Sequence, residues 1–190
     1  MTLLTTDTVA AGKRIALLGA ALATGFAGAP AFAASQGTLG ATSTGSISIT
    51  ASVPSRARIT GLSDVDFTNQ DPATAAANAQ NLCVWSNTAT KGYTVTASGS
   101  GASSAFTLSN GSNTVPYSVE WAATTGQTTG AAVTTGTSTS SLTSTATSQN
   151  CSSGAASTAS LVVRISTTDL ATMSAGTSYT GTLTLLVTPQ

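Results

Sequence analysis

Histidine is absent from this sequence, and charge is scarce: Lys and Arg together number 6, and Asp and Glu together number 6, among 190 residues. Without histidine, neither a Ser-His-Asp nor a Cys-His arrangement can form, and the many hydroxyl groups have no such base to activate them. The few acidic residues still allow one catalytic arrangement, a pair of carboxylates at the spacing found in glycosidases. We therefore expect that the protein is not an enzyme.

The formal net charge is zero, so the chain has no basic surface that would attract phosphate groups. We expect no nucleic-acid partner for this reason. Ser and Thr account for 65 residues. Such an abundance of small hydroxyl side chains is typical of half-polar β-strands or of a protein that assembles with itself.

Metal-ligand patterns are also poor. Asp64, Asp66 and Asp71 lie within one turn region, an arrangement that would suit Ca²⁺. The EF-hand template requires Gly at its sixth position and Glu at its twelfth, and this sequence has Asn69 and Ala75 there. We therefore interpret the three carboxylates as solvated or turn-capping groups and expect neither a bound metal nor a cofactor.

Long apolar runs are limited to the start of the chain. Lys13 and Arg14 precede an apolar run over residues 15–29, and the sequence PAFA at 30–33 ends in a small-x-small site. This pattern predicts a secretory signal peptide over residues 1–33, with cleavage after Ala33. A membrane anchor is the alternative, but about 15 apolar residues fall short of the ~20 that span a bilayer. We expect a secreted protein.

The two cysteines, Cys83 and Cys151, have only each other as partners within the chain. Export places them in an oxidising compartment, which favours a disulfide between them. A reactive thiol and a metal pair are the alternatives, and zinc would need histidines or a second cysteine pair. The disulfide would contribute on the order of 4 kcal/mol in the chain-entropy model.

The region behind the signal peptide has two parts. Residues 34–45 are small, polar and rich in Gly, which predicts a flexible leader. Residues 46–54 form an alternating segment closed by Pro54, which cannot continue a sheet ladder. Ser and Thr occupy one face of this segment, and the other face is apolar, with Ile47, Ile49, Ala51 and Val53. Such a strand needs an apolar groove to receive it.

The rest of the chain, residues 55–190, alternates with a period of two over many short segments. These segments are separated by turn signals such as SNGSN, and they predict an all-β fold, an antiparallel β-sandwich. Pro116 demotes its strand to an edge or a bulge. The Ala-rich stretch at 73–80 is the exception, for which we expect a turn or two of helix. The expected strands cover residues 56–62, 82–86, 92–98, 105–109, 114–121, 159–166 and 179–190.

A low-complexity tract and two tryptophans need interpretation within this pattern. Residues 122–149 are nearly all Ala, Thr, Ser and Gly, anchored by Val133 and Leu142. We expect a surface excursion or a weak hairpin of low order, whose deletion would cost little stability. Trp85 and Trp121 could stack on a sugar ring, but each lies in an apolar alternating strand, which favours core packing.

Three stretches resemble a known family. ITASVP at 49–54, PYSVEW at 116–121 and the closing AGTSYTGTLTLLVTP at 175–189 are similar to pilin subunits of the chaperone–usher pathway, nearest to the colonisation-factor type. The spaced cysteine pair and the terminal Y-x-G-x-L-x-L-x-V-x-P also resemble the spore coat protein U family of archaic pili. The resemblance covers most of the chain after the signal peptide.

The resemblance implies an immunoglobulin-like sandwich that lacks its last strand and is completed by donor-strand exchange. A periplasmic chaperone would cover the groove first, an outer-membrane usher would assemble the fimbria at the cell surface, and pilin subunits would be the partners. Ile47, Ile49, Ala51 and Val53 would be the donor residues. The acceptor groove would be lined by residues 159–165 and by Tyr179, Leu183, Leu185 and Val187, since the sequence ends soon after this strand.

Two interpretations of residues 46–53 stay open at this stage. The segment fills the groove of a neighbouring molecule, which we favour, or it is the first strand of a complete sandwich. The second interpretation corresponds to a secreted binding module, either an adhesin or a carbohydrate-binding protein. A strand so apolar on one face, preceded by a free leader, favours a fimbrial subunit that supports adhesion or biofilm formation.

Overall fold

The computed structural model describes residues 33–190, so the predicted signal peptide lies outside the described residues except for Ala33. The chain divides into two compact units, Met1–Ser52 and Val53–Gln190, which are described separately here. Within residues 33–190, no helix is both long enough and apolar enough to cross a membrane.

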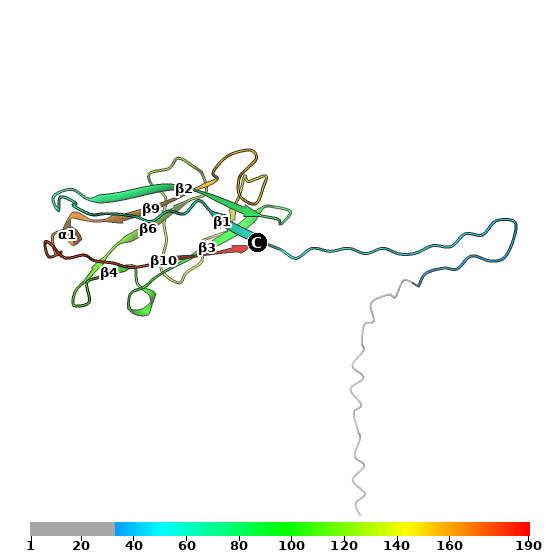
Figure 1. Ribbon diagram of the computed structural model, residues 1–190, viewed down its shortest axis with the longest axis horizontal. Helices are drawn as coiled ribbons and strands as arrows, with labels where there is room; N and C mark the ends of the chain where they lie inside the picture. Colours follow the sequence, from blue (N-terminus) through cyan, green and yellow to red (C-terminus); the bar gives the residue numbers. More distant parts are fainter. Residues whose placement is uncertain (1–32) are drawn as a thin grey trace, which may run out of the picture. The chain divides into compact units, whose positions relative to one another are not determined.

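The second unit consists of antiparallel strands in two main sheets and a small ribbon (Figure 1). The first sheet has the order β1-β2-β9-β6-β7, and the second has the order β10-β3-β8. The strands of the first sheet are β1 (Ala57–Thr60), β2 (Ala76–Ser86), β9 (Ala159–Ile165), β6 (Ser118–Ala122) and β7 (Ala131–Ala132). Those of the second are β10 (Leu183–Pro189), β3 (Gly92–Gly99) and β8 (Leu142–Thr143). The ribbon pairs β4 (Thr107–Ser109) with β5 (Thr114–Pro116), and the helical turns are η1 (Ala102–Ser104) and α1 (Thr167–Leu170).

The core lies between the inner faces of the two sheets. Alternate residues of each strand point into it because successive side chains of a strand lie on opposite faces. The largest contributions come from β2, β3, β6 and β9, whose inward residues include Leu82, Val84, Tyr93, Val95, Val119, Trp121, Leu161, Val163 and Ile165. The predicted all-β antiparallel fold is therefore confirmed.

Pro116 marks the point where the chain changes sheet. It is the last residue of β5, which pairs with β4 in the ribbon, while β6 begins two residues later in the first sheet. Tyr117, between the two strands, donates its backbone N–H to the carbonyl of Phe106 (2.9 Å). The interruption that the proline predicts is thus a switch between sheets, while Val115 and Val119 stay buried on one continuous face.

The Ala-rich stretch at 73–80 is not helical, so that prediction was wrong. Residues 76–80 form the first half of β2 and pair with β9 from Ala76 opposite Ile165 to Leu82 opposite Ala159. Helix propensity is a weak preference, and the backbone hydrogen bonds and burial offered by β9 outweigh it. The consequence is a long β2 whose inner face carries two polar side chains, Asn78 and Gln80, before the apolar half begins.

The low-complexity tract is built into the sandwich, contrary to the low order we expected. Its strands β7 and β8 pair with β6 in one sheet and with β3 in the other. Val133 and Ala146 are buried, although the tract is poor in large apolar residues. At Gly130 an added Cβ would lie 2.6 Å from the backbone carbonyl of Trp121, so the chain runs alongside β6 in direct backbone contact. The buried Val133 and close packing of small residues together order this tract.

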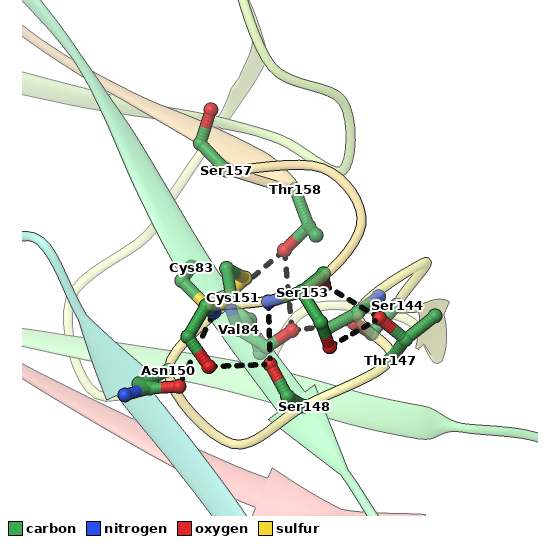
Figure 2. Close-up of a disulfide and its surroundings, with 12 residues drawn as sticks. Cys83, Val84, Ser144, Thr147, Ser148, Asn150, Cys151, Ser153, Ser157 and Thr158 are labelled. Carbon is green, nitrogen blue, oxygen red and sulfur yellow. Dashed lines mark hydrogen bonds between the residues drawn. A yellow bond between two sulfur atoms is a disulfide. The ribbon is translucent and has the colours of Figure 1, made fainter.

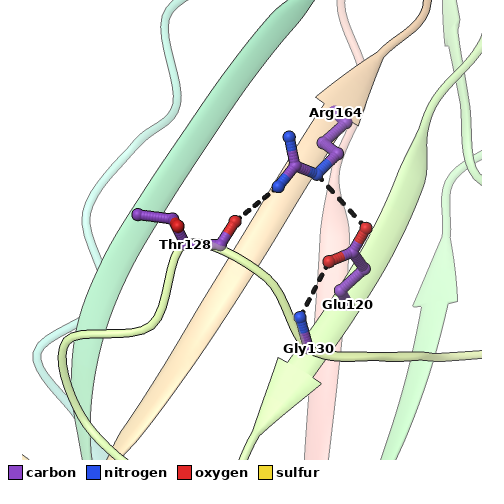
Figure 3. A network of polar contacts seen from close by, with 4 residues as sticks. All are labelled: Glu120, Thr128, Gly130 and Arg164. Carbon is purple, nitrogen blue, oxygen red and sulfur yellow. Dashed lines mark hydrogen bonds and ion pairs between the residues drawn. The ribbon is translucent and has the colours of Figure 1, made fainter.

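A polar network holds the same tract against the outer face of the first sheet (Figure 3). Arg164 on β9 donates from Nε to Glu120 Oε1 (3.2 Å) on β6 and from Nη2 to the carbonyl of Thr128. The second carboxylate oxygen of Glu120 accepts the N–H of Gly130 (2.8 Å). Both side chains are partly buried, so the ion pair fixes the tract more firmly than an exposed pair would.

The predicted disulfide between Cys83 and Cys151 is present, and no free cysteine exists among the described residues (Figure 2). It ties the loop around residues 144–158 to the outer face of β2, where Trp85 packs half-buried against it. Thr158 continues the ladder beyond the end of β9, because its Oγ1 accepts from Val84 N–H (3.0 Å) and donates to Val84 O (3.1 Å). The tryptophan prediction is met fully by Trp121 in the core and partly by Trp85.

Candidate functional site: an open groove between two sheet edges

The last strand, β10, has a partner on one side only. It pairs with β3 from Leu183 opposite Gly99 to Pro189 opposite Tyr93, and the described residues place no strand along its other edge. Even-numbered residues make the hydrogen bonds on the paired side: Gln190 N–H donates to Gly92 O (3.0 Å) and Thr180 N–H donates to Ser109 O (2.9 Å). In an antiparallel ladder these alternate with residues that point their N–H and C=O groups the other way.

The odd-numbered residues of β10 therefore present both their backbone groups and their side chains to the open side. Their backbone groups lie at the free edge, and their side chains are the inward-facing ones. Leu183, Leu185 and Val187 pack against the core yet remain half-buried, unlike the fully buried inner face of β3. Pro189, which has no N–H, occupies one of the unpaired positions, where its missing donor costs nothing. This is the geometry of a sheet edge that lacks its next strand.

The first sheet approaches β10 through its edge strand, β1. β1 pairs with β2 along one edge and also contacts β10. Its inward residues are Ala57 and Ile59, while Arg58 faces solvent. After β1 the chain continues through residues 62–72 without strand pairing, held by the amide of Gln80, which accepts from Ser63 N–H (2.9 Å) and donates to Ser63 O (3.2 Å).

Beside β10 lies a groove of about 1310 Å³. Residues 62–70 form one side and residues 174–183 the other, while β9 supplies much of the floor. Tyr117 also lines the groove, and its hydroxyl is buried without a hydrogen-bond partner. Burial raises the pKa of this phenol, so the hydroxyl stays protonated and able to donate. The remaining floor residues are Leu108, Leu161, Val163, Ile165, Leu170 and Met173.

The structure brings most of the predicted acceptor residues to this groove. Leu183 and Leu185 line it directly, and Val187 continues the same face of β10 toward β1. Tyr179 lies just before β10, and its hydroxyl accepts the N–H of Ser174 (3.2 Å), which lowers its pKa. Residues 161–165 of β9 line the floor, as expected for residues 159–165. Their role as an acceptor stays a prediction.

Sequence reasoning missed the other half of the groove. The wall formed by residues 62–70, the buried Tyr117 and the contribution of α1 were not anticipated. A signal was present in the alternation of Val65 and Phe67, both of which pack against the core. The Asp residues in the same stretch cap turns instead, since Asp66 Oδ1 accepts Thr68 N–H (2.8 Å) and Asp71 Oδ1 accepts Ala73 N–H (2.9 Å).

The predicted donor segment is described largely within the first unit. Residues 47–53 belong to no strand, and the side chains of Ile47, Ile49 and Val53 are 75%, 83% and 82% exposed. Ser46 makes an isolated antiparallel bridge to Ser35, with N–H···O distances of 2.9 and 3.0 Å, which closes the leader into a loop. Large aliphatic side chains so exposed are a liability unless a partner covers them.

Comparison with known proteins gives a limited likeness. No protein-family model matches the sequence, and no curated protein matches it. A solved structure described by the words "Chaperone-tip adhesin complex is vital for synergistic activation of CFA/I fimbriae biogenesis" is similar at 14% sequence identity and a TM-score of 0.49. The match covers 70% of this chain and 41% of that one, so this chain spans about two fifths of its length. We base function on the groove geometry instead.

Proposed function

We propose that the protein is a structural subunit of an extracellular fimbria, joined to its neighbours by donor-strand complementation. Residues 46–53 of a second copy of this chain occupy the groove and pair with the free edge of β10. The observation that carries the proposal is the free edge itself: the same residues, Leu183, Leu185 and Val187, offer both unpaired backbone groups and half-buried apolar side chains.

The dimensions and the pattern of the two partners match. The open positions of the edge run from Gly181 to Val187, and the apolar residues of the donor run from Ile47 to Val53. Both stretches are roughly 20 Å long at ~3.3 Å per residue. Both also place their apolar residues at every second position, so one register brings all the donor side chains over the floor and leaves the hydroxyls outside.

Strand addition would satisfy both partners energetically. Each large aliphatic side chain of the donor would gain about 1.5–3 kcal/mol on full burial. The edge groups of β10 would exchange water for backbone hydrogen bonds, which supply affinity, while the pockets supply register.

The proposal extends to export and assembly. An oxidising compartment fits the Cys83–Cys151 disulfide, and a secreted subunit with an open groove needs protection before assembly. A periplasmic chaperone would cover the groove, and an outer-membrane usher would pass the subunit into the fibre, with adhesion or biofilm formation as the outcome. The role is structural and not enzymatic.

A matched pair of substitutions tests the proposal. Ile49→Asp places a carboxylate on the apolar face of the donor segment, while Ser48→Asp places the same charge on the hydroxyl face. Burying an unpaired charge costs several kcal/mol, so Ile49→Asp should abolish fibres and Ser48→Asp should retain them. Fibres are counted by electron microscopy on cells that assemble the wild-type chain, with export checked by immunoblotting. Equal effects of the two variants would overturn the proposal.

A further inference from the structure

We infer that the acidic end of one sandwich receives the basic end of the next, and that this attraction steers donor-strand addition. The inference rests on the proposed function, because it concerns which part of a second copy meets the mouth of the groove. It extends that function from the apolar groove to the charged surface around it. The residues that carry it all lie in the second unit.

The few charged side chains of the second unit are sorted by sign. Arg164 and Glu120 form an ion pair with each other on the outer face of the first sheet. The other charged side chains make no ion pair among residues 33–190 and fall into two groups. The basic group is Arg56, Arg58 and Lys91, and the acidic group is Asp64, Asp66, Asp71 and Asp169.

The basic group lies at the end of the sandwich where β2 finishes. The backbone N–H of Asn87 donates to Arg56 O (3.1 Å), and its Oδ1 accepts Arg56 N–H (2.6 Å). Arg58 lies opposite Trp85 in the ladder between β1 and β2. Lys91 directly precedes β3, which starts from the same end. The side chains of Arg56 and Arg58 are exposed, so this end presents positive charge to solvent.

The acidic group lies toward the opposite end, where β2 begins. The first residue of β2 pairs with the last residue of β9 there, and α1 follows β9 directly (Figure 1). Asp71 comes shortly before β2, and Asp169 lies in α1. Asp64 and Asp66 are exposed on the groove wall formed by residues 62–70. This end therefore presents negative charge beside the groove.

The separation of the two ends decides which molecules their charges connect. β2 runs from Ala76 to Ser86, which corresponds to roughly 33 Å at ~3.3 Å per residue. The Debye length at physiological salt is about 8 Å, so the two ends of one subunit hardly attract each other. A second copy can bring its basic end close to the acidic end. Exposed charges in contact add little affinity, but they raise the rate of association and favour one orientation.

The covalent link between donor segment and β1 brings the two ends together in a fibre. Val53 precedes Arg56 by three positions, so Arg56 lies within roughly 10 Å of the point where the added strand leaves the groove. β10 runs toward the basic end, since Leu183 pairs with the last residue of β3 and Pro189 with its second. An added strand antiparallel to β10 leaves at the acidic end, whereas a parallel one would set like charges together.

The test compares two fluorescent peptides that differ in the arginines. The peptide of residues 44–54 has no charged side chain, whereas the peptide of residues 44–60 adds Arg56 and Arg58. Both carry the same label and blocked ends. Each is mixed with the full chain carrying Ile49→Asp, whose own segment cannot fill a groove, and association is followed by stopped-flow anisotropy. Rates are measured at about 0.1 M and about 1 M NaCl, where the Debye lengths are about 10 Å and about 3 Å.

The longer peptide should associate faster by on the order of tenfold at low salt, and high salt should remove this advantage. Arg56→Glu with Arg58→Glu in the longer peptide should reverse the sign: association becomes slower than that of the uncharged peptide and speeds up as salt is added. Arg56→Lys with Arg58→Lys is the control, because it keeps the charge and changes the shape of the group.

Neutralising each end of the folded chain locates the attraction. Asp64→Asn with Asp66→Asn should remove the advantage of the longer peptide, and asparagine still offers an Oδ1 to the N–H of Thr68. Lys91→Asn at the basic end is the matched control and should change neither rate. Asparagine tolerates the positive φ of 52° at that position. A faster longer peptide in the Lys91→Asn chain would instead show that the arginines arrive at the basic end, against the inference.

The outcomes separate the inference from the proposed function. If both peptides bind at equal rates, or if the advantage of the longer one persists in high salt or in the Asp64→Asn, Asp66→Asn chain, charge does not steer the addition and the groove alone keeps its function. If neither peptide binds the Ile49→Asp chain, the proposed function fails and the inference with it. An advantage that both salt and the asparagine variant remove supports both.

Discussion

Removing the disulfide gives a quantitative prediction. Cys83 and Cys151 are separated by 68 positions, so their bond closes a long loop in the unfolded chain. The chain-entropy model assigns such a loop about 4 kcal/mol of stabilisation. We therefore expect that changing both cysteines to alanine lowers the free energy of unfolding by about 4 kcal/mol. That is a large share of the 5–15 kcal/mol typical of a domain.

Urea unfolding followed by tryptophan fluorescence measures this difference, with the wild type and the double alanine variant under the same conditions. The disulfide lies on the outer face of β2, away from the groove, so peptide binding to the folded variant should be unchanged. A loss below about 1 kcal/mol would show that the entropic reasoning is wrong here.

Two further predictions concern parts of the fold that sequence patterns undervalue. Val133→Ala, in the low-complexity tract, should lower the free energy of unfolding by about 1–3 kcal/mol in chemical unfolding, because the side chain is buried. A change near zero would show that the tract is a loosely packed surface excursion. Thr158→Val should cost about 1–3 kcal/mol because it leaves the N–H of Val84 without its hydroxyl acceptor, whereas Thr158→Ser, which keeps the hydroxyl, should cost clearly less. A loss for Thr158→Val no larger than that for Thr158→Ser would show that the hydroxyl bonds do not dominate.

The strands could be predicted where one face of a segment is apolar and the other polar. Tyr93, Val95 and Ala97 alternate with Thr and Ser, and all three are fully buried in β3. The same rule found β6, β9 and β10. It works because a period of two is a direct consequence of pleating, and burial of one face fixes which residues are apolar.

The rule failed where tertiary contacts replace side-chain pattern. Residues 76–80 form a strand because β9 pairs with them, and the sequence of an Ala-rich stretch does not indicate this pairing. The tract at 122–149 is held by a partly buried ion pair between Arg164 and Glu120 and by backbone contact at Gly130, which no alternation of side chains within the tract indicates. The groove wall at 62–70 escaped notice because its order comes from the side chain of Gln80, not from a ladder.

The donor segment could be recognised from the sequence, but the molecule whose groove it fills could not. The exposed Ile47 and Ile49 indicate that an apolar groove must cover them, but they do not indicate whether that groove belongs to the same molecule or to a neighbour.

Residue-resolved hydrogen exchange of β10 tests strand addition most directly. In the Ile49→Asp chain, the amides of Leu183, Leu185 and Val187 face the open edge and should exchange fast, while those of Thr184 and Leu186 are paired with β3 and should exchange slowly. Adding the peptide of residues 44–54 should slow the first set selectively, and the same peptide carrying Ile49→Asp should not. Unchanged exchange at the three odd-numbered residues, or slow exchange there before any peptide is added, would contradict an open acceptor edge.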